Sequence, residues 1–199
     1  MAQPRIEFWY EFASSYSYLS VMRIEALAAQ AGVAVDWRPF LLGPVFLAMG
    51  WNDSPFNIYP PKGRYMWRDL ARLADKYDLP FRMPSRFPRN GLLAARVALL
   101  GAQDEWVAPF SRAVMTANFA EDREIGDAAV IAELLGGLGL DAARLIEDAQ
   151  SDANKLALRR QTEQAAELGL FGAPSFRVGD ELFWGNDRLE DALVWAGRA

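Results

Sequence analysis

The stretch that decides the fold is Ile6-Glu7-Phe8-Trp9-Tyr10-Glu11-Phe12, followed at once by Ala13-Ser14-Ser15-Tyr16-Ser17-Tyr18. The first part is dominated by aromatic residues and predicts a strand, and the serines that follow predict the start of a helix. A helix start gathers unpaired backbone N–H groups and the positive end of the helix dipole. We therefore expect this turn to be able to hold an anion such as a thiolate.

The composition removes several kinds of chemistry. The chain has 199 residues, of which none is Cys and none is His. Dithiol exchange, a cysteine nucleophile, a Ser-His-Asp triad and an imidazole metal site are therefore excluded. A thiolate at the helix start would have to arrive with a ligand. The 52% hydrophobic and 24% charged content is that of an ordinary globular protein.

Charge and hydropathy narrow the range of partners. The net charge of −5 argues against nucleic-acid binding, which normally needs a basic surface. The longest apolar stretch, residues 40–51, is interrupted by Gly43-Pro44 and is shorter than the roughly 20 residues of a membrane span. The first five residues do not resemble a secretory signal. We expect a cytoplasmic protein without nucleic-acid or membrane partners.

The order of the expected elements indicates an α/β fold interrupted by helices. A helix over 17–31 that stops at Gly32 and a strand over 33–39 form a βαβ opening, so the first two strands should be parallel. Strands over 175–178 and 181–184 are close enough to form an antiparallel hairpin. Between these halves and after them, helices are expected over residues 62–77, 90–101, 105–118, 127–135, 141–168 and 188–197, the last capped by Asn186 or Asp187.

A second informative motif is Gly172-Ala173-Pro174-Ser175-Phe176-Arg177-Val178, in which a proline opens a strand. A proline at this place costs no internal hydrogen bond of the sheet. An X-Pro bond also adopts the cis form far more readily than other peptide bonds. We expect Ala173-Pro174 to be cis and to lie beside the helix start at Ser14.

Four segments together resemble the 2-hydroxychromene-2-carboxylate isomerases, and the similarity spans nearly the whole chain. This family lies with the kappa-class glutathione transferases in the DsbA-like branch of the thioredoxin superfamily. The resemblance implies a thioredoxin-like domain over residues 1–40 and 165–199, an inserted all-helical domain over 41–164, and a homodimer. The segments that carry it are Glu11 to Tyr18, Pro60-Pro61-Lys62, Phe171 to Phe176, and Phe183-Trp184-Gly185-Asn186-Asp187-Arg188.

The resemblance implies that the hydroxyl of Ser14 meets the sulfur of glutathione as a hydrogen-bond donor; a plain helix cap is the alternative role. Ser15 stands where many relatives have proline, which leaves open which serine contacts sulfur. Asp187 would pair with the ammonium group of the tripeptide and Arg188 with a carboxylate. The full set expected to bind glutathione is Ser14, Gly172, Ala173, Pro174, Trp184, Gly185, Asn186, Asp187 and Arg188.

The substrate side is expected near Asn52, Asp53 and Lys62. Lys62 could pair with a substrate carboxylate, or it could be an ordinary lysine on a helix surface. The segment Phe87 to Asn90, together with Tyr65 and Trp67, could wall an aromatic substrate, although core packing explains these side chains equally well.

The function expected from this resemblance is a glutathione-dependent isomerase. It would interconvert 2-hydroxychromene-2-carboxylate and trans-o-hydroxybenzylidenepyruvate, or a close analogue, as in the breakdown of aromatic hydrocarbons. One alternative is a kappa-like transferase that conjugates glutathione to electrophiles. Another is a non-catalytic binding protein with a thioredoxin fold, which the lack of cysteine also allows.

Overall fold

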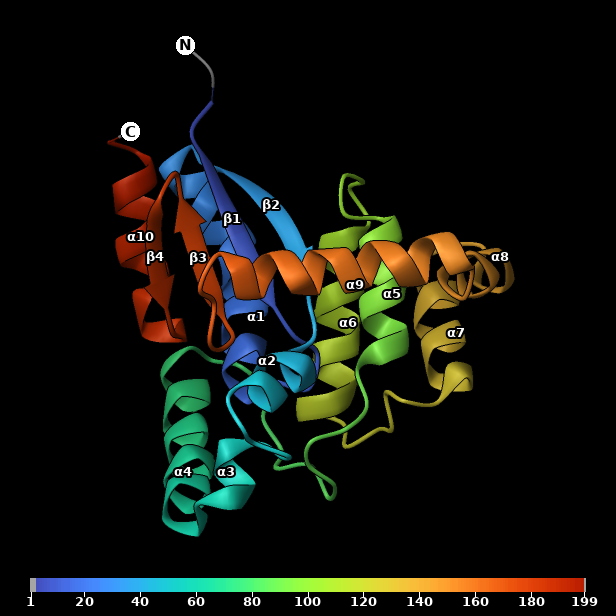
Figure 1. Cartoon of the computed structure of the whole chain (residues 1–199), viewed down its shortest axis with the longest axis horizontal. Helices are drawn as coiled ribbons and strands as arrows, with labels where there is room; N and C mark the ends of the chain where they lie inside the picture. The colour runs from blue at the N-terminus through green and yellow to red at the C-terminus, as the bar shows by residue number, and fades with distance from the viewer. Residues whose placement is uncertain (1–2, 199) are drawn as a thin grey trace.

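The computed structural model describes residues 3–198, in which four strands form one mixed sheet (Figure 1). The order across the sheet is β2 (Ala34–Pro39), β1 (Arg5–Tyr10), β3 (Ser175–Val178) and β4 (Glu181–Trp184). Strands β1 and β2 are parallel, whereas β3 pairs antiparallel with both β1 and β4. The expected parallel opening and the closing hairpin are both confirmed.

Successive side chains of β1 point to opposite faces of the sheet. On one face Phe8 stacks on Phe176, with ring centroids 5.3 Å apart, in a core shared with α1 (Ser15–Ala31) and α10 (Leu189–Ala196). On the other face Trp9 packs with Phe40 and with Ala165 of α9 (Asp152–Glu167). The sheet is therefore covered on both faces by helices.

Helix α1 ends where the sequence predicts and begins two residues earlier than predicted, at Ser15 rather than at residue 17. Ser14 caps it, since its Oγ accepts the backbone N–H of Ser17 at 3.3 Å. The helix ends at Gly32, whose φ of 68° lies in the left-handed region that glycine adopts easily. These two residues fix the length of α1, and its amino end lies just after the carboxyl end of β1.

The helical segment between β2 and β3 contains the expected helices, with one division that was not expected. The predicted helix over 141–168 is two helices, because Ser151 caps the second by accepting the N–H of Asn154 at 3.2 Å. The elements are α4 (Pro60–Lys76), α5 (Leu92–Leu100), α6 (Val107–Phe119), α7 (Ala128–Gly137), α8 (Ala142–Ala149) and α9. Buried residues of α5 and α6 share one apolar cluster with β1 and α1.

Two short helices were not expected from the sequence. Helix α2 (Leu42–Ala48) contains Gly43-Pro44 in its first turn, where a missing N–H is tolerated. Helix α3 (Pro55–Ile58) begins with a proline after Ser54, whose Oγ accepts the N–H of Phe56. Within residues 3–198, the structure contains no helix with both the length and the apolar character that crossing a membrane requires.

Candidate active site

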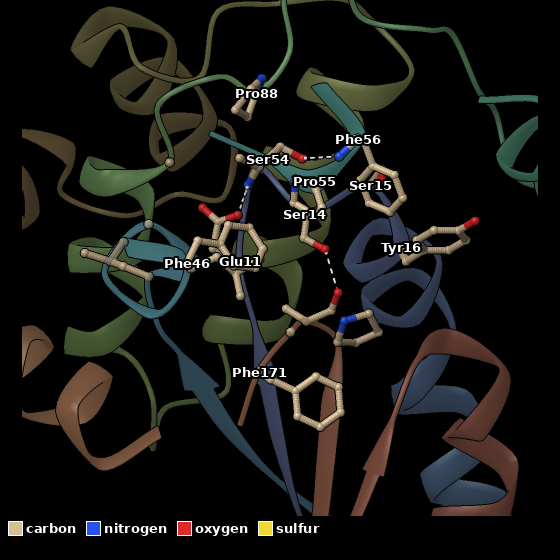
Figure 2. Close-up of a pocket in the computed structure, with 18 of the residues that line it drawn as sticks. Glu11, Ser14, Ser15, Tyr16, Phe46, Ser54, Pro55, Phe56, Pro88 and Phe171 are labelled. Atoms are coloured by element: carbon tan, nitrogen blue, oxygen red, sulfur yellow. Dashed lines mark hydrogen bonds between the residues drawn. The ribbon is translucent and has the colours of Figure 1, made fainter. Parts of the chain in front are cut away.

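The turn between β1 and α1 brings Ser14 to a large cavity. Its hydroxyl donates to the backbone oxygen of Ala173 at 2.9 Å (Figure 2), across 159 residues of sequence. The backbone N–H of Ser14 donates to the backbone oxygen of Glu11 at 3.0 Å, and this hydrogen bond closes the turn. Ser14 is therefore both the cap of α1 and the link between the helix start and the segment before β3.

The segment before β3 has the expected form. The Ala173-Pro174 bond is cis, and both residues line the cavity next to Ser14. Gly172 allows a close approach, because a Cβ at this position would lie 2.4 Å from Nε1 of Trp184. The Trp184 ring packs edge-on against Phe171, with centroids 4.8 Å apart. Glycine and indole together form one side of the cavity.

Both adjacent serines line the cavity, but they differ in burial and in the partner of their hydroxyl group. Ser15 is buried, and its hydroxyl donates to Sδ of Met66 at 3.0 Å. Ser14 is only partly buried, and the backbone oxygen that it contacts belongs to a cavity residue, Ala173. The geometry favours Ser14 over Ser15 as the group that meets a ligand.

Trp184 to Arg188 line the next part of the cavity, but the expected cap is wrong. Asn186 and Arg188 bound a short 3-10 helix, η1 (Asn186–Arg188), and α10 begins after it without a side-chain cap. The Asn186 side chain turns inward instead, where its Oδ1 accepts from Ser20 at 3.1 Å and from Arg23 at 3.2 Å. Its Nδ2 is buried with no partner in the described structure.

Asp187 and Arg188 are exposed at the cavity rim. They pair with each other at 3.1 Å, and Arg188 also donates to Asp191 at 2.8 Å. Because both ions are solvated and paired, a ligand would have to share or replace these contacts. Their position still allows an ammonium group and a carboxylate to bind side by side.

The three residues expected on the substrate side also line the cavity. Lys62 is exposed, and its Nζ lies 5.0 Å from the centre of the Tyr59 ring. The Asp53 carboxylate accepts from Asn57 at 3.1 Å, so it organises its own loop. Asn52 is exposed on the same loop. Asn57, which was not expected from the sequence to take part in the site, also donates to the backbone oxygen of Phe87 at 3.3 Å.

A wall of apolar side chains was missed by the sequence analysis. Phe46 and Trp51 pack with ring centroids 5.6 Å apart on one side of the cavity. The signal was present, since residues 40–51 form the longest apolar stretch, but it was considered only as a membrane segment. The members of this α2 wall are Leu41, Leu42, Phe46, Leu47, Met49 and Trp51.

The aromatic residues that were considered from the sequence divide into two groups. Phe87 and Pro88 line the cavity. Trp67 lies behind them and packs against Phe87, with centroids 4.9 Å apart. Tyr65 is 63% exposed, and the guanidinium of Arg72 lies over its ring. Neither Trp67 nor Tyr65 is among the cavity-lining residues.

The pKa values of two acidic groups of the cavity, the Glu11 carboxyl and the Tyr16 hydroxyl, are raised. Burial raises the pKa of Glu11 to about 7, although the N–H of Ala13 donates to its Oε2 at 3.0 Å and opposes this shift. Burial, helped by the adjacent Asp69, also raises the pKa of Tyr16, whose hydroxyl donates to Asp69 at 3.0 Å. Glu11 was quoted from the sequence only as part of a motif.

The cavity has a volume of about 1440 Å³. This exceeds the roughly 300–1,000 Å³ that is typical of a site for one small molecule. The Ser14 side offers hydrogen-bonding groups, whereas the α2 wall offers apolar surface. The arrangement can accommodate a polar ligand and an apolar ligand together.

Comparison with known proteins identifies the family. The model of the DSBA-like thioredoxin domain matches residues 5–193. A 2-hydroxychromene-2-carboxylate isomerase of Sphingobium xenophagum is 35% identical over 190 residues, which cover 93% of this chain and 94% of that protein. Glutathione S-transferase kappa 1 of Caenorhabditis elegans is 25% identical over 94% of this chain and 88% of that protein.

A solved structure of a 2-hydroxychromene-2-carboxylate isomerase is also similar. It superposes with a TM-score of 0.87 at 28% identity and covers 98% of this chain and 95% of that one. The chain belongs to the DSBA-like thioredoxin domain family and, within it, to the 2-hydroxychromene-2-carboxylate isomerases. The thioredoxin-like fold and the isomerase class of enzyme that the sequence predicts are confirmed.

Proposed function

We propose that this protein is a glutathione-dependent isomerase that interconverts 2-hydroxychromene-2-carboxylate and trans-o-hydroxybenzylidenepyruvate or a close analogue. The observation that carries the proposal is one cavity that is lined both by Ser14 with the Ala173-Pro174 segment and by the apolar α2 wall. Glutathione would supply a thiol that adds to the conjugated double bond of the substrate and leaves again after rotation. The names of the similar isomerases and kappa transferases support this assignment.

Ser14 would donate its hydroxyl hydrogen to the sulfur. In the structure this hydrogen is directed to the oxygen of Ala173, and a hydroxyl can rotate toward a new acceptor at little cost. A donor aimed at sulfur favours the charged thiolate over the thiol. The start of α1 adds the positive end of its dipole at the same place.

The residues present fit glutathione. Asn186 lines the cavity, and its buried Nδ2 has no partner among the described residues, so this amide would have a donor to offer to a carboxylate or carbonyl oxygen of the ligand. Ala173 can pair with a peptide unit through its backbone, and Asp187 and Arg188 can take the charged γ-glutamyl end. The remaining residues proposed to surround the tripeptide are Gly172, Pro174, Trp184 and Gly185.

The aromatic carboxylate would bind on the opposite side. Lys62 supplies a cation at the rim, and Asn52 and Asp53 supply polar groups beside it. The α2 wall provides apolar area for fused rings, whose burial favours binding. Within this proposal the protein is cytoplasmic, as the sequence itself leads us to expect, and works as a homodimer, as the resemblance implies.

The proposal is tested by following the ultraviolet spectrum of 2-hydroxychromene-2-carboxylate with the protein, with and without glutathione. We expect isomerisation that requires glutathione and leaves its concentration unchanged. Accumulation of a glutathione adduct would instead indicate the kappa-like transferase, a possibility that the kappa relatives raise. Absence of glutathione affinity would indicate a non-catalytic binding protein.

A further inference from the structure

Glu11 is a buried carboxyl group in the same turn as Ser14. Its residue is 8% exposed, yet it lines the cavity (Figure 2). The N–H of Ala13, just before the helix start, donates to Oε2 at 3.0 Å. The other carboxylate oxygen, Oε1, lies close to Gly91. A Cβ added at Gly91 would be only 3.1 Å from it. The carboxyl group is therefore held in place next to the proposed position of the sulfur.

No cation balances this carboxylate. Among residues 3–198, Glu11 takes part in no ion pair, and Arg89 of the neighbouring segment is engaged by Asp122 and by Asn118. Burial without a cation is the reason that its pKa is raised to about 7. Arg89 itself lines the cavity, and the other ionisable groups that line it are Asp53 on the loop before α3, Lys62 and Asp69 on α4, Tyr16 on α1, and Asp187 and Arg188 on η1.

Two negative charges at one helix start would repel each other strongly in this setting. The dielectric constant is low around a buried group, and a thiolate at Ser14 would share the helix start with Glu11. Pairs of acidic groups in such sites keep one proton between them. When the thiolate is present, the carboxyl group is the partner that must stay neutral.

We propose that Glu11 takes up the proton that the glutathione thiol loses at Ser14 and holds it as a neutral acid. In this step the S–H bond breaks with its electron pair left on sulfur, and an O–H bond forms on the Glu11 carboxylate. The reverse transfer restores the thiol when glutathione leaves, so no other reactant is needed. This inference rests on the proposed function, because it requires glutathione at Ser14.

The proton balance of glutathione binding tests the proposal at pH 8. At this pH a carboxyl group with a pKa of about 7 is largely ionised, and a thiol with a pKa of about 8.5 is mostly protonated. We expect the wild type to release almost no proton on binding, because Glu11 retains it. Glu11→Gln has no acceptor and should release more than about half a proton per site while its bound glutathione still shows thiolate absorbance.

Two variants serve as controls. Glu11→Asp keeps a carboxyl group in the cavity and should retain the proton as the wild type does. Glu25→Gln removes a carboxylate of α1 that lies outside the cavity, where Glu25 pairs with Arg112, and should not alter the proton balance. Calorimetry in two buffers of different ionisation enthalpy measures the number of protons released for each variant.

Equal proton release by the wild type and Glu11→Gln, with glutathione bound to both, would overturn the proposal. If Glu11→Gln does not fold or bind, the infrared spectrum of the wild type decides. Binding at pH 8 should then increase the signal of a protonated carboxyl group, and no increase would reject the role of Glu11. Failure of the wild type to bind glutathione would instead reject the proposed function itself.

Discussion

The two sides of the cavity are built in different ways. One side, which we call the serine wall, consists of Ser14, Gly172 to Pro174 and Trp184 to Arg188. Its parts come from distant segments that backbone hydrogen bonds join, such as the one from the Gly185 N–H to the Pro174 oxygen at 3.0 Å. The sheet and the start of α1 therefore determine its geometry.

The α2 wall comes from one continuous segment, residues 41–51, and part of it is exposed. Helix α2 has no side-chain cap, and Leu47 and Met49 are 69% and 46% exposed. Val45 anchors the helix in the cluster around Trp9, while the Trp51 N–H donates to the nearby Phe46 oxygen at 2.9 Å. Under the proposed function, the chemistry would belong to the serine wall, and substrate choice would belong to the α2 wall, whose partly exposed side chains can change without disturbing the sheet.

The strongest test of this division is Ser14→Ala. We expect about a hundred- to a thousandfold loss of isomerase activity, because the sulfur loses a directed donor. The loss of the cap should cost only about 1 kcal/mol of stability. The thiolate absorbance of bound glutathione should also titrate at higher pH than in the wild type. Ser15→Ala is the matched control, since the Ser15 hydroxyl contacts Met66, and an unchanged titration in Ser14→Ala would remove Ser14 from the mechanism.

A second test concerns Glu11, in the turn that leads to Ser14, and its effect on the stability of the protein as a function of pH. The pKa of Glu11 is about 7 in the folded protein and near 4.5 in the unfolded chain, so folding favours its protonated form. Its contribution is fully present below pH 4.5 and is lost as the pH rises through 7. Urea unfolding from pH 4 to 8 should show the wild type losing on the order of 3 kcal/mol relative to Glu11→Gln. A constant difference between the two proteins would contradict the raised pKa.

The separation of the two walls predicts opposite effects for two charged residues. Lys62→Met should weaken binding of the aromatic carboxylate about ten- to a hundredfold, because one ammonium partner is lost, and should leave glutathione nearly unaffected. Asp187→Asn should raise the concentration of glutathione required, with little change in KM for the aromatic substrate at saturating glutathione. Steady-state kinetics in which the concentrations of both ligands are varied give the KM for glutathione and the KM for the aromatic substrate of each variant. Equal effects of each variant on both ligands would show that the two-wall assignment is wrong.

The smallest expected effect is that of Phe46→Ala in the α2 wall. Removal of a partly buried ring should cost about 1–2 kcal/mol of binding to the aromatic substrate, or roughly tenfold in KM. The affinity for glutathione and the thiolate titration should not change. Tyr65→Ala, at an exposed aromatic residue outside the cavity, is the control. A loss of glutathione binding in Phe46→Ala would mean that the walls are coupled.

Most regular elements could be predicted because their signals are local. Ser14 and Gly32 mark the ends of α1, and the sequence around Pro174 predicts both the cis bond and the following strand. The division between α8 and α9 was missed although Ser151 is a good cap, because apolar residues continue on both sides of it. Helix α2 was missed because Gly43-Pro44 was interpreted as an interruption rather than as a first turn.

The candidate site was predicted less completely than the fold. The residues that were expected to bind glutathione do line one cavity, although they come from separate segments of the chain. They are Ser14, Gly172 to Pro174 and Trp184 to Arg188. The inward turn of Asn186 was not predictable, because its partners Ser20 and Arg23 lie on a helix more than 160 residues earlier. The same is true of Asn57, whose contact with Phe87 depends on how α3 packs.

The sequence by itself determined the strand and helix start around Ser14, the proline that opens β3, and a chemistry without Cys or His. These depend on neighbouring residues and on composition. Only the tertiary structure decided that the Ser14 hydroxyl reaches Ala173, that Ser15 turns to Met66, and that Glu11 is buried without a cation. Burial and long-range contacts arise from many weak interactions between remote segments, which no local pattern in the chain encodes.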